Sequence, residues 1–518
     1  MSKVKIFLLL QFLFFFSVPV LAQVDTAWVR RYDGGNGADK SVALAVDKNG
    51  NVYVTGTSPG SGTQEDYITI KYNSSGDTVW VRRYNGPTNN RDFATDLTID
   101  NNGNVYVTGE SWGGTYWDFA TIKYAPNGDT LWARRYNGPG NFFDGAYALA
   151  VDDSGNVYVT GFSYGSGPGP DYATIKYAPN GDSLWVRRYT GPSNGGGSAY
   201  ALAVDDSGNV YVTGVSERDY ATIKYAPNGD TLWVRHYNGP GYWLDWAQAL
   251  SVDGSGNLHV TGYSASSDIF PFNYDYATIK YSPDGNILWV RRYDGTGNLD
   301  DYARALVVDD SGNVYVTGGS YGSGTGQDYT TIKYSTAGDT LWVRRYNGSG
   351  NSGDHAYSLA LDDSGNVYVT GGSVAGGTSD DYVTIKYAPN GDTLWIRRYN
   401  GPGNASDIAH ALAVDDSGNV YVTGESVAGG TGDDYVTIKY NSFGCAAWAG
   451  DANGSGGITL PDIVYLINSI FKAGPKPDPF CSGDANADGK ILLSDIVYLI
   501  NHIFRSGPAP VKSLECCL

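Results

Sequence analysis

One six-residue string, NVYVTG or a near copy of it, occurs eight times along this chain of 518 residues. The copies are spaced by 48 to 56 residues, and they begin at Asn51, Asn104, Asn156, Asn209, Asn257, Asn313, Asn366 and Asn419. A sequence period of this length is typical of architectures built from one repeated group of strands or helices. Most of the chain therefore folds as one unit repeated eight times.

Each unit contains four short segments in which apolar residues alternate with polar or small ones, which is the pattern of β-strands. In the third unit these segments are Ala146–Asp152, Asn156–Gly161, Asp171–Tyr177 and Ser183–Tyr189. Tight turns separate them, and the turn at Ala178–Asp182 contains the Asn-Gly pair that favours hairpins. The 70 Gly and 42 Tyr of the chain fit many short aromatic strands joined by such turns. Four antiparallel strands per unit predict the blades of a β-propeller.

The two ends of the repeat region complement each other. A lone WVRRY strand, Trp28–Tyr32, precedes the first unit, and the last unit stops after its third strand, Asp434–Tyr440. We therefore expect the N-terminal strand to complete the last blade and close the ring, which removes exposed sheet edges. In an alternative frame WVRRY is the innermost strand and no such closure is needed, but the tight Pro-Asn-Gly-Asp turn then has to cross between blades. The expected fold is an all-β, eight-bladed β-propeller with four-stranded blades.

The units resemble the SBBP family of β-propeller repeats and, more loosely, NHL-type repeats. The resemblance rests on the core AxAVDxxGNVYVTG, which is seen at Ala148–Gly161, and it covers roughly residues 25–441. It implies the propeller fold and says almost nothing about function, because many unrelated functions share this fold.

Sequence variation is concentrated in the loops of one face. The loops between the second and third strands range from Val215–Arg218 to Tyr263–Tyr274, and variable loops often carry function. Flat aromatic rings on such loops suit stacking on a sugar or a peptide. The ligand-binding residues predicted on this basis are Trp112, Trp117, Phe143, Trp243 and Phe272, with Tyr116, Phe142, Tyr242, Trp246, Phe270 and Tyr274 close to them in sequence. In the alternative interpretation these rings pack against neighbouring loops and seal the rim.

Charged residues that recur in every unit are expected to cap turns and to join blades. They include a Lys in each TIKY segment, an Arg pair in nearly every WVRRY segment, and an Asp before each third strand, at Asp66, Asp118, Asp171, Asp219, Asp275, Asp328, Asp381 and Asp434. The alternative is a ring of Asp around the channel that binds a cation.

After Gly444 the pattern changes to two copies of a loop followed by a helix, 33 residues apart. The loops place oxygen-bearing residues at the spacing that Ca²⁺ requires, so we predict two calcium sites. The predicted ligands are Asp451, Asn453, Ser455, Gly457 and Asp462 in the first loop, and Asp484, Asn486, Asp488, Lys490 and Asp495 in the second. Ser455 stands where the second loop has a carboxylate, so the first site is expected to be weaker.

The two predicted helices carry apolar residues at helical spacing, at Ile463, Leu466, Ile467 and Ile470, and at Ile496, Leu499, Ile500 and Ile503. We expect them to pack as an antiparallel pair whose core is so small that calcium drives its folding.

This module resembles the dockerin type I domain over residues 445 to about 510. The resemblance implies calcium-dependent docking onto a cohesin-like domain of a scaffold protein, often in polysaccharide breakdown. The family's recognition positions often carry hydroxyl residues, whereas this chain has Leu460-Pro461 and Leu493-Ser494 there. That departure puts a standard cohesin partner in doubt, and an intramolecular role against the propeller is the alternative.

Residues 1–22 are expected to be a cleaved signal peptide, with a basic start, an apolar run and small residues at the cleavage site; an uncleaved membrane anchor is the alternative. The expected organisation is then a propeller at 23–443, the dockerin-like module at 444–511 and a Cys-containing tail at 512–518, in a secreted protein without membrane insertion. The net charge of −19 argues against nucleic acid and anionic membranes as partners. The four Cys all lie in the last 75 residues, at Cys445, Cys481, Cys516 and Cys517. A disulfide from the tail to Cys445 or Cys481 of the module is preferred over one between the adjacent Cys516 and Cys517.

No catalytic residues are assigned, because no constellation of acids or bases stands out. The irregular acids Glu110, Glu217, Asp268 and Glu425 are interpreted as solvated loop residues, and the five His as structural, at His236, His259, His355, His410 and His502. The favoured function is a non-catalytic glycan- or protein-binding propeller. A polysaccharide hydrolase or lyase with its active site on the variable face is the alternative.

Overall fold

The computed structural model describes residues 26–441, except 36, 168, 242, 268–272, 377–378 and 429–431, and beyond them residues 452, 458–472, 477, 485 and 490–505. The predicted signal peptide, the four Cys and most of the predicted calcium ligands lie outside the described residues.

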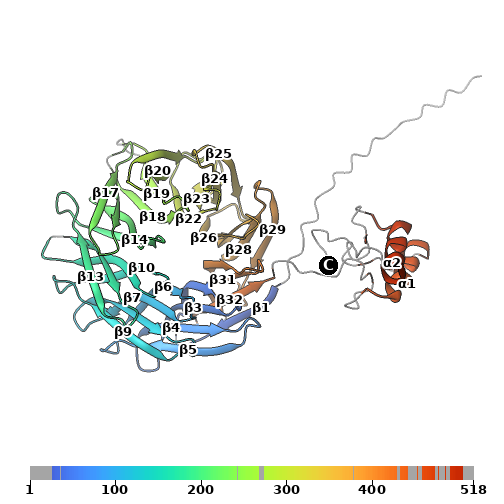
Figure 1. Cartoon of the computed structure of the whole chain (residues 1–518), viewed down its shortest axis with the longest axis horizontal. Helices are drawn as coiled ribbons and strands as arrows, with labels where there is room; N and C mark the ends of the chain where they lie inside the picture. Colours follow the sequence, from blue (N-terminus) through green and yellow to red (C-terminus); the bar gives the residue numbers. More distant parts are fainter. Residues whose placement is uncertain are drawn as a thin grey trace, which may run out of the picture.

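The described strands form eight separate four-stranded antiparallel sheets arranged as a ring of blades (Figure 1). Blade 1 contains β2 (Lys40–Val46), β3 (Val52–Pro59), β4 (Glu65–Tyr72) and β5 (Thr78–Tyr84). Blade 2 contains β6 (Asp92–Ile99), β7 (Val105–Trp112), β8 (Trp117–Tyr124) and β9 (Thr130–Tyr136). Blade 3 contains β10 (Asp144–Val151), β11 (Val157–Tyr164), β12 (Pro170–Tyr177) and β13 (Ser183–Tyr189). Blade 4 contains β14 (Gly197–Val204), β15 (Val210–Ser216), β16 (Asp219–Tyr225) and β17 (Thr231–Tyr237).

The second half of the ring repeats the same order. Blade 5 contains β18 (Asp245–Val252), β19 (Leu258–Ala265), β20 (Tyr274–Tyr281) and β21 (Ile287–Tyr293). Blade 6 contains β22 (Asp301–Val308), β23 (Val314–Tyr321), β24 (Gln327–Tyr334) and β25 (Thr340–Tyr346). Blade 7 contains β26 (Asp354–Leu361), β27 (Val367–Val374), β28 (Asp380–Tyr387) and β29 (Thr393–Tyr399). Blade 8 contains β30 (Asp407–Val414), β31 (Val420–Ala428), β32 (Gly432–Tyr440) and, from the other end of the chain, β1 (Thr26–Tyr32).

The ring is closed by the N-terminal strand, as the sequence predicts. β1 pairs antiparallel with β32, for example Trp28 with Lys439 and Arg30 with Thr437 (Figure 1). The first strand of each unit, such as β10, contacts the first strands of the neighbouring blades, so these strands are innermost. The WVRRY strands lie at the other edge of each sheet and are outermost. The alternative frame, with WVRRY innermost, is therefore wrong.

The hydrophobic core lies between neighbouring blades. In one cluster, Tyr53, Tyr67 and Trp80 of blade 1 pack on residues of β6, β7 and β8 in blade 2. The equivalent cluster at the point of closure brings Trp28 of β1 and Tyr421 of β31 onto strands of blade 1. Burial of apolar area between sheets thus holds each blade to the next, and a blade without its neighbour would expose that area.

The repeated charged residues also join blades, as expected. Arg30 stacks on the ring of Trp28 at 5.6 Å and donates to the carbonyl of Gly76 in blade 1 at 2.6 Å. Lys71 lies 5.0 Å from the ring of Tyr53 and donates to a carbonyl in the next blade. Such contacts combine cation–π attraction with hydrogen bonds, and the other blades repeat them.

The Gly that ends NVYVTG is required by a close approach of two strands. In blade 3 the pairing of β10 with β11 slips by one residue between Ala146 and Ala148, which is a β-bulge. The bulge brings the carbonyl of Gly145 against Gly161, so a Cβ atom at that position would overlap it. This explains why the last residue of the repeated string is Gly in every blade.

The second and third strands are longer than the sequence pattern indicates. The hairpin of blade 3 continues beyond Gly161, with Phe162 paired to Tyr172 and Tyr164 to Pro170. Cross-strand hydrogen bonding continues past the apolar alternation, and it converts predicted loop residues into strand ends.

The two predicted helices are α1 (Leu460–Phe471) and α2 (Leu493–Arg505). Their buried residues Ile463, Leu466, Ile496 and Leu499 form one cluster, and the other four predicted core residues pack against it, which confirms the predicted apolar faces. Among the described residues, no helix has the length and apolar character needed to span a membrane.

We predict that Trp28→Ala destabilises the propeller by about 3–5 kcal/mol, because a buried indole between two sheets is removed and a cavity is left. Trp28 is 8% exposed and donates to the carbonyl of Ser74 at 3.2 Å. The control is Val79→Ala on β5, because Val79 is 52% exposed and its loss should change stability by less than about 0.5 kcal/mol. Denaturant unfolding followed by Trp fluorescence measures both, and equal midpoints for the two variants would contradict ring closure by β1.

Candidate ligand-binding site at the channel mouth

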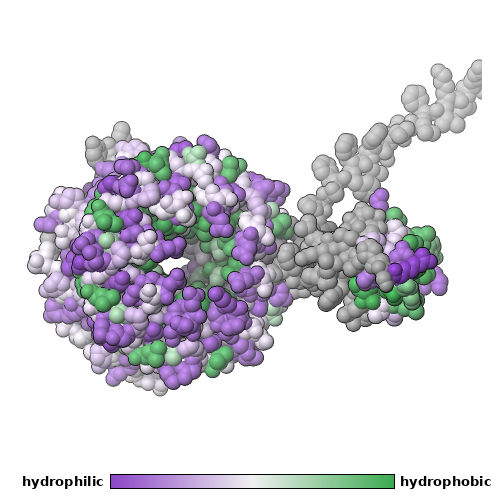
Figure 2. Space-filling model, in the orientation of Figure 1, coloured by the Kyte–Doolittle hydropathy of each residue, from purple (hydrophilic) through white to green (hydrophobic). Residues whose placement is uncertain are grey.

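The face that carries the variable loops surrounds the mouth of the central channel. The innermost strands begin there and the second strands end there, so their end residues meet around the opening. Figure 2 shows the ring hollowed at its centre, with hydrophilic and hydrophobic side chains interspersed around the opening.

The sequence repeat breaks down at several positions around the channel mouth, among them the bulge of the innermost strand. The residues next to the bulge are small in nearly every blade, but the residue at the bulge, which is the fourth of the strand in every blade except blade 1, varies between blades. In chain order these residues are Val42, Thr95, Tyr147, Tyr200, Gln248, Arg304, Tyr357 and His410. A position that varies within an otherwise constant repeat is not needed for the fold, so it is free to serve a ligand.

A continuous series of aromatic contacts follows part of this opening, from blade 3 to blade 6. Tyr147 and Tyr200 are stacked, with ring centroids 5.2 Å apart and planes at 13°. Tyr200 contacts Trp246 at 5.0 Å. We call the series the aromatic arc, and its members are Phe142, Tyr147, Phe162, Tyr164, Tyr200, Trp246, Tyr263 and Tyr302. Each ring except the two at the ends is held by rings on both sides, so the arc is a preorganised surface.

The predicted rim aromatics are largely packed against one another. Trp112 and Trp117 are strand ends that pair across the hairpin of blade 2, with their rings 5.3 Å apart. Phe143 contacts Tyr116 at 5.0 Å. The assignment of Trp112 and Trp117 to an open loop was wrong, because the β-hairpin extends as far as they do, whereas Tyr116 and Phe143 lie in loops as predicted. Trp246 is likewise inside β18 and not before the blade.

Trp243 is the predicted rim residue that is exposed. It is 42% accessible, and the guanidinium carbon of Arg218 lies 5.8 Å from its ring. Phe272, together with Tyr242 and Phe270, lies outside the described residues. Sequence reasoning missed Tyr147, Tyr200, Tyr263 and Tyr302 because they lie within strands; the variable fourth position was the signal that could have found the first two.

The rest of the channel mouth carries charged and titratable groups. Arg304 lies 5.1 Å from the ring of Tyr357, which in turn is 5.7 Å from the ring of His410. Glu425 forms an ion pair with Lys40 at 2.8 Å, and its other oxygen is 3.8 Å from Nε2 of His410. Burial raises the pKa of Glu425, but hydrogen bonding and attraction to His410 and Lys40 outweigh it and lower the pKa. We call Arg304, His410, Glu425 and Lys40 the charged half of the channel mouth. It can bind a polar or anionic group beside the aromatic arc.

Glu110 occupies the same place in blade 2 as Glu425 in blade 8, but it has no cationic partner. It lies in β7, paired with Phe93 and Phe119, and its carboxylate packs over Gly145. Desolvation raises its pKa to about 7, with no hydrogen bond or ion pair in the described part of the chain to oppose this. The interpretation of Glu110 and Glu425 as solvated loop acids was wrong, because extended strand pairing places both in the wall of the channel mouth.

The other irregular residues have structural surroundings. Glu217 accepts a hydrogen bond from the amide of Gly195 at 3.0 Å and so fixes a neighbouring loop. His259 replaces a Tyr and contacts Asp253 at 3.1 Å, with burial lowering its pKa to about 4. His236 replaces an Arg and contacts the hydroxyl of Tyr189 at 2.6 Å. His355 and His410 lie within β26 and β30, His502 lies in α2, and Asp268 is outside the described residues.

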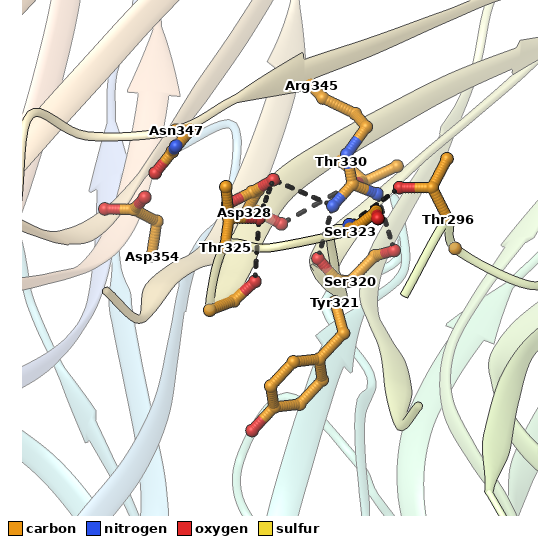
Figure 3. A network of polar contacts seen from close by, with 12 residues as sticks. Thr296, Ser320, Tyr321, Ser323, Thr325, Asp328, Thr330, Arg345, Asn347 and Asp354 are labelled. Carbon is orange, nitrogen blue, oxygen red and sulfur yellow. Dashed lines mark hydrogen bonds and ion pairs between the residues drawn. The ribbon is translucent and has the colours of Figure 1, made fainter. Parts of the chain in front are cut away.

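The repeated Asp at the start of the third strand pairs with an Arg of the outermost strand and does not face the channel, so the alternative of a cation-binding ring of Asp around the channel is wrong. In blade 6, Asp328 binds Arg345 at 2.8 Å, and the same Arg donates to the hydroxyl of Ser320 at 2.8 Å (Figure 3). This network ties the third strand to the second and the fourth. It recurs in every blade except blade 4, where His236 replaces the Arg.

Three of the predicted calcium ligands lie in the described residues. Asp462 is fully buried and accepts from the amide of Thr459 at 2.8 Å, as part of a capping box at the start of α1. Asp495 is buried in the same way at the start of α2 and accepts from the amide of Leu492 at 2.8 Å. Lys490 precedes α2. The other seven ligands lie outside the described residues, so the two calcium sites stay a prediction.

The closed ring of four-stranded sheets, with a variable site at one end of its channel, defines a β-propeller. A family model described as the SBBP β-propeller repeat matches residues 28–62, 79–115 and 394–428, so the chain carries repeats of this type in those segments. No curated protein shows a significant match.

Solved structures that resemble this chain have very different sequences. Sqt1 from Chaetomium thermophilum is 12% identical, with a TM-score of 0.50 over 81% of this chain and 98% of that one. Virginiamycin B lyase from Staphylococcus aureus is 10% identical, with a TM-score of 0.39 over 79% and 98%. An ulvan lyase, solved with a bound saccharide, is 13% identical, with a TM-score of 0.38 over 71% and 95%. At such identities the likeness concerns the fold alone.

We predict that Glu110 makes the propeller less stable as the pH rises from about 4.5 to about 7. In this range the unfolded state has released the proton while the native state still holds it, so the free energy of unfolding falls, by roughly 3 kcal/mol in total. Glu110→Gln removes this penalty. Its melting temperature should therefore exceed that of the wild type at pH 8 by more than at pH 4.

Glu425→Gln is the matched control with the opposite sign. The native pKa of Glu425 is lowered, so its stabilising effect is present above the unfolded pKa and is lost as the pH falls through the native value. The variant should melt below the wild type at pH 8. The same pH dependence in both variants would show that the surroundings of the two Glu are not as described.

Proposed function

We propose that this is an exported, non-catalytic binding protein whose propeller binds a glycan at the channel mouth. The C-terminal module attaches it, in the presence of Ca²⁺, to a cohesin-like domain of a scaffold, in the setting of polysaccharide breakdown. Export follows from the expected signal peptide at residues 1–22.

The aromatic arc is the observation that carries the proposal for the propeller. Seven of its eight rings lie in strands of four neighbouring blades, and Phe142 lies in the loop before β10, so the surface is largely rigid and is longer than one sugar ring. Stacked rings present flat faces and edges to C–H groups, and the hydroxyls of Tyr147 and Tyr200 add hydrogen-bonding capacity. The charged half beside it supplies Arg304 and Lys40 for acidic substituents. These features favour a chain of sugars over a protein, which would need a broader apolar surface.

A duplicated apolar surface supports docking by the helical module. Equivalent positions of α1 and α2 carry exposed hydrophobic residues, and the exposed fractions are 62% for Phe471 and 61% for Phe504. The other exposed pairs are Leu460 with Leu493 and Val464 with Val497. Exposed apolar residues arranged in duplicate are suited to a protein partner. The Leu residues stand where dockerins often have hydroxyls, so the partner's surface should be more apolar than that of a standard cohesin.

A second candidate is a polysaccharide hydrolase or lyase, and Glu110 is the observation that favours it. A carboxylic acid with a pKa of about 7 can donate a proton to a leaving group at neutral pH. Its closeness to Tyr147, whose pKa is raised mainly by desolvation and also by Glu110, places it beside the aromatic arc.

We predict that the double variant Tyr147→Ala/Tyr200→Ala binds its glycan at least about tenfold more weakly, a loss of about 1.4 kcal/mol, because the stacked pair is removed. Glycan-array screening of the wild type finds the ligand, and calorimetry measures the affinities. The control is Tyr321→Ala, since Tyr321 ends β23 and makes no ring contact in the described structure. Unchanged binding by the double variant, or an array with no ligand at all, refutes the glycan site.

Incubating the wild type with the glycan found on the array, and assaying for new reducing ends and unsaturated products, decides between binding and catalysis. The binding proposal expects none. Release by the wild type that Glu110→Gln abolishes, with binding retained, would support the enzyme instead.

We predict that the full chain binds an immobilised cohesin domain in Ca²⁺ and is released by chelator, because the loop ligands must hold the ion for the helices to stay packed. Asp484→Ala should weaken capture more than Asp451→Ala, since the second loop is expected to bind more tightly. Phe471→Ser/Phe504→Ser should lose capture while still binding Ca²⁺. Capture that survives the chelator would contradict calcium-dependent docking.

A further inference from the structure

Acidic side chains of neighbouring blades meet at seven of the eight junctions of the ring; at the junction of blades 3 and 4, Gly197 stands where the other innermost strands have Asp. In most blades, the Asp before the third strand lies beside the Asp that begins the innermost strand of the next blade. Asp328 of blade 6 and Asp354 of blade 7 are such a pair, and Asn347, from the connection between the two blades, lies next to them (Figure 3). At this junction two carboxylates share their surroundings with a neutral amide.

At two junctions the neutral residue is replaced by a third acid. The position directly after the outermost strand is neutral in six places, Asn85, Asn137, Thr190, Asn238, Asn347 and Asn400, but it is Asp33 or Asp294 in the other two. The junction of blades 8 and 1 thus combines Asp33, Asp39 and Asp434, and the junction of blades 5 and 6 combines Asp275, Asp294 and Asp301. In each set, one oxygen from every residue lies within 4.8 Å of the others.

Both sets contain buried carboxylate oxygens with no hydrogen-bond partner in the described structure, Oδ1 of Asp39 and Asp434 in the first and Oδ1 of Asp275 in the second. Such oxygens also occur at the junctions of blades 1 and 2 and of blades 6 and 7, where the third residue is neutral. Asp434 is 4% exposed and uses Oδ2 to bind Arg31 at 2.9 Å. Asp275 is 6% exposed and uses Oδ2 to bind Arg292 at 2.8 Å. In both residues Oδ1 is buried and accepts no hydrogen bond within the described part of the protein. A buried carboxylate oxygen without a donor is costly, so a ligand that supplies positive charge would be stabilising.

The charges at these junctions are not balanced within the described part of the protein. One Arg faces three carboxylates in each set, which leaves two negative charges in excess.

We propose that each of these two junctions binds one Ca²⁺ ion, held by Asp33, Asp39 and Asp434 or by Asp275, Asp294 and Asp301. Ca²⁺ takes oxygen ligands at about 2.3–2.6 Å, so it bridges oxygens up to roughly 5 Å apart, whereas Mg²⁺ at about 2.0–2.1 Å needs a tighter set. Waters complete the coordination. The six junctions with a neutral residue lack the third charge and bind the ion more weakly.

The site between blades 8 and 1 has a structural consequence that the other lacks. Asp33 follows β1, Asp39 precedes β2, and Asp434 lies in β32. An ion there connects the strand that closes the ring to both blades at the closure, so it adds to the β1–β32 pairing. The site between blades 5 and 6 strengthens an ordinary junction, where the chain is already continuous.

The test compares the full wild-type chain with Asp33→Asn, Asp294→Asn and the double variant. Asn is the natural residue at the equivalent place in five other junctions, so the variants should fold, and near-UV circular dichroism verifies this. The control is Asp206→Asn, the same charge change on an exposed turn. Bound Ca²⁺ per chain is measured by equilibrium dialysis, and melting temperatures are measured in Ca²⁺, in Mg²⁺ and in chelator. The C-terminal loops are identical in all five proteins, so their ions cancel in the comparison.

Each single variant should bind one Ca²⁺ fewer than the wild type, and the double variant two fewer, while Asp206→Asn binds the full number. The rise in melting temperature on adding Ca²⁺ should shrink most in Asp33→Asn, and Mg²⁺ should produce a smaller rise in the wild type. Equal Ca²⁺ content in the wild type and the folded double variant overturns the proposal, whatever the C-terminal loops bind.

Discussion

The pairing of β1 with β32 is the interaction on which the rest of this structure depends. Without it, blade 8 would have three strands, β32 would expose an unpaired edge, and Trp28 would not fill the space between Tyr72 and Tyr421. Because each blade is stabilised by its neighbours, an open end would weaken both blades at the gap. The channel mouth also depends on closure, since its wall consists of innermost strands that contact one another around the ring.

Structural and functional residues are separated in this chain. Residues that recur in every unit bind one another, as Arg83 binds Asp66 and Ser58, or as Lys71 covers Tyr53. Residues that differ between units line the opening, with the aromatic arc in blades 3 to 6 and the charged half in blades 6, 8 and 1. A repeat fold can vary those positions and keep its architecture, because the buried clusters that join neighbouring blades do not include them. The same reasoning identifies Asp33 and Asp294, which depart from the repeat at two junctions.

The helical module has a much smaller hydrophobic core than the propeller. Its buried cluster contains only six residues in the described part, far fewer than a domain normally needs for stability. Bound Ca²⁺ would supply the missing stability, and the buried Asp462 and Asp495 lie at the helix starts, where the two loops end. The exposed Phe471 and Phe504 leave an apolar surface for a partner. Under the proposed function, the module attaches the protein to a partner and the propeller binds the glycan.

The blade number, the strand order and the closure by the N-terminal strand could all be predicted from the amino-acid sequence, and the structure confirms them. These follow from periodicity, alternation and the odd WVRRY segment, all of which are local patterns that a single chain displays. The sequence also predicted the apolar faces of α1 and α2. Little of the candidate site could be predicted in this way: the loop aromatics were recognised, but Trp112 and Trp117 proved to be paired strand ends.

The stacking of Tyr147 on Tyr200 could not be predicted from the sequence, because these residues belong to different blades and meet through the curvature of the ring. The same is true of the opposite pKa shifts of Glu110 and Glu425, which occupy the same place in their repeats. Their pKa values differ in direction because one faces aromatic rings and the other faces Lys40 and His410. The surroundings of a side chain in a propeller come from neighbouring blades, and no pattern within one repeat records them.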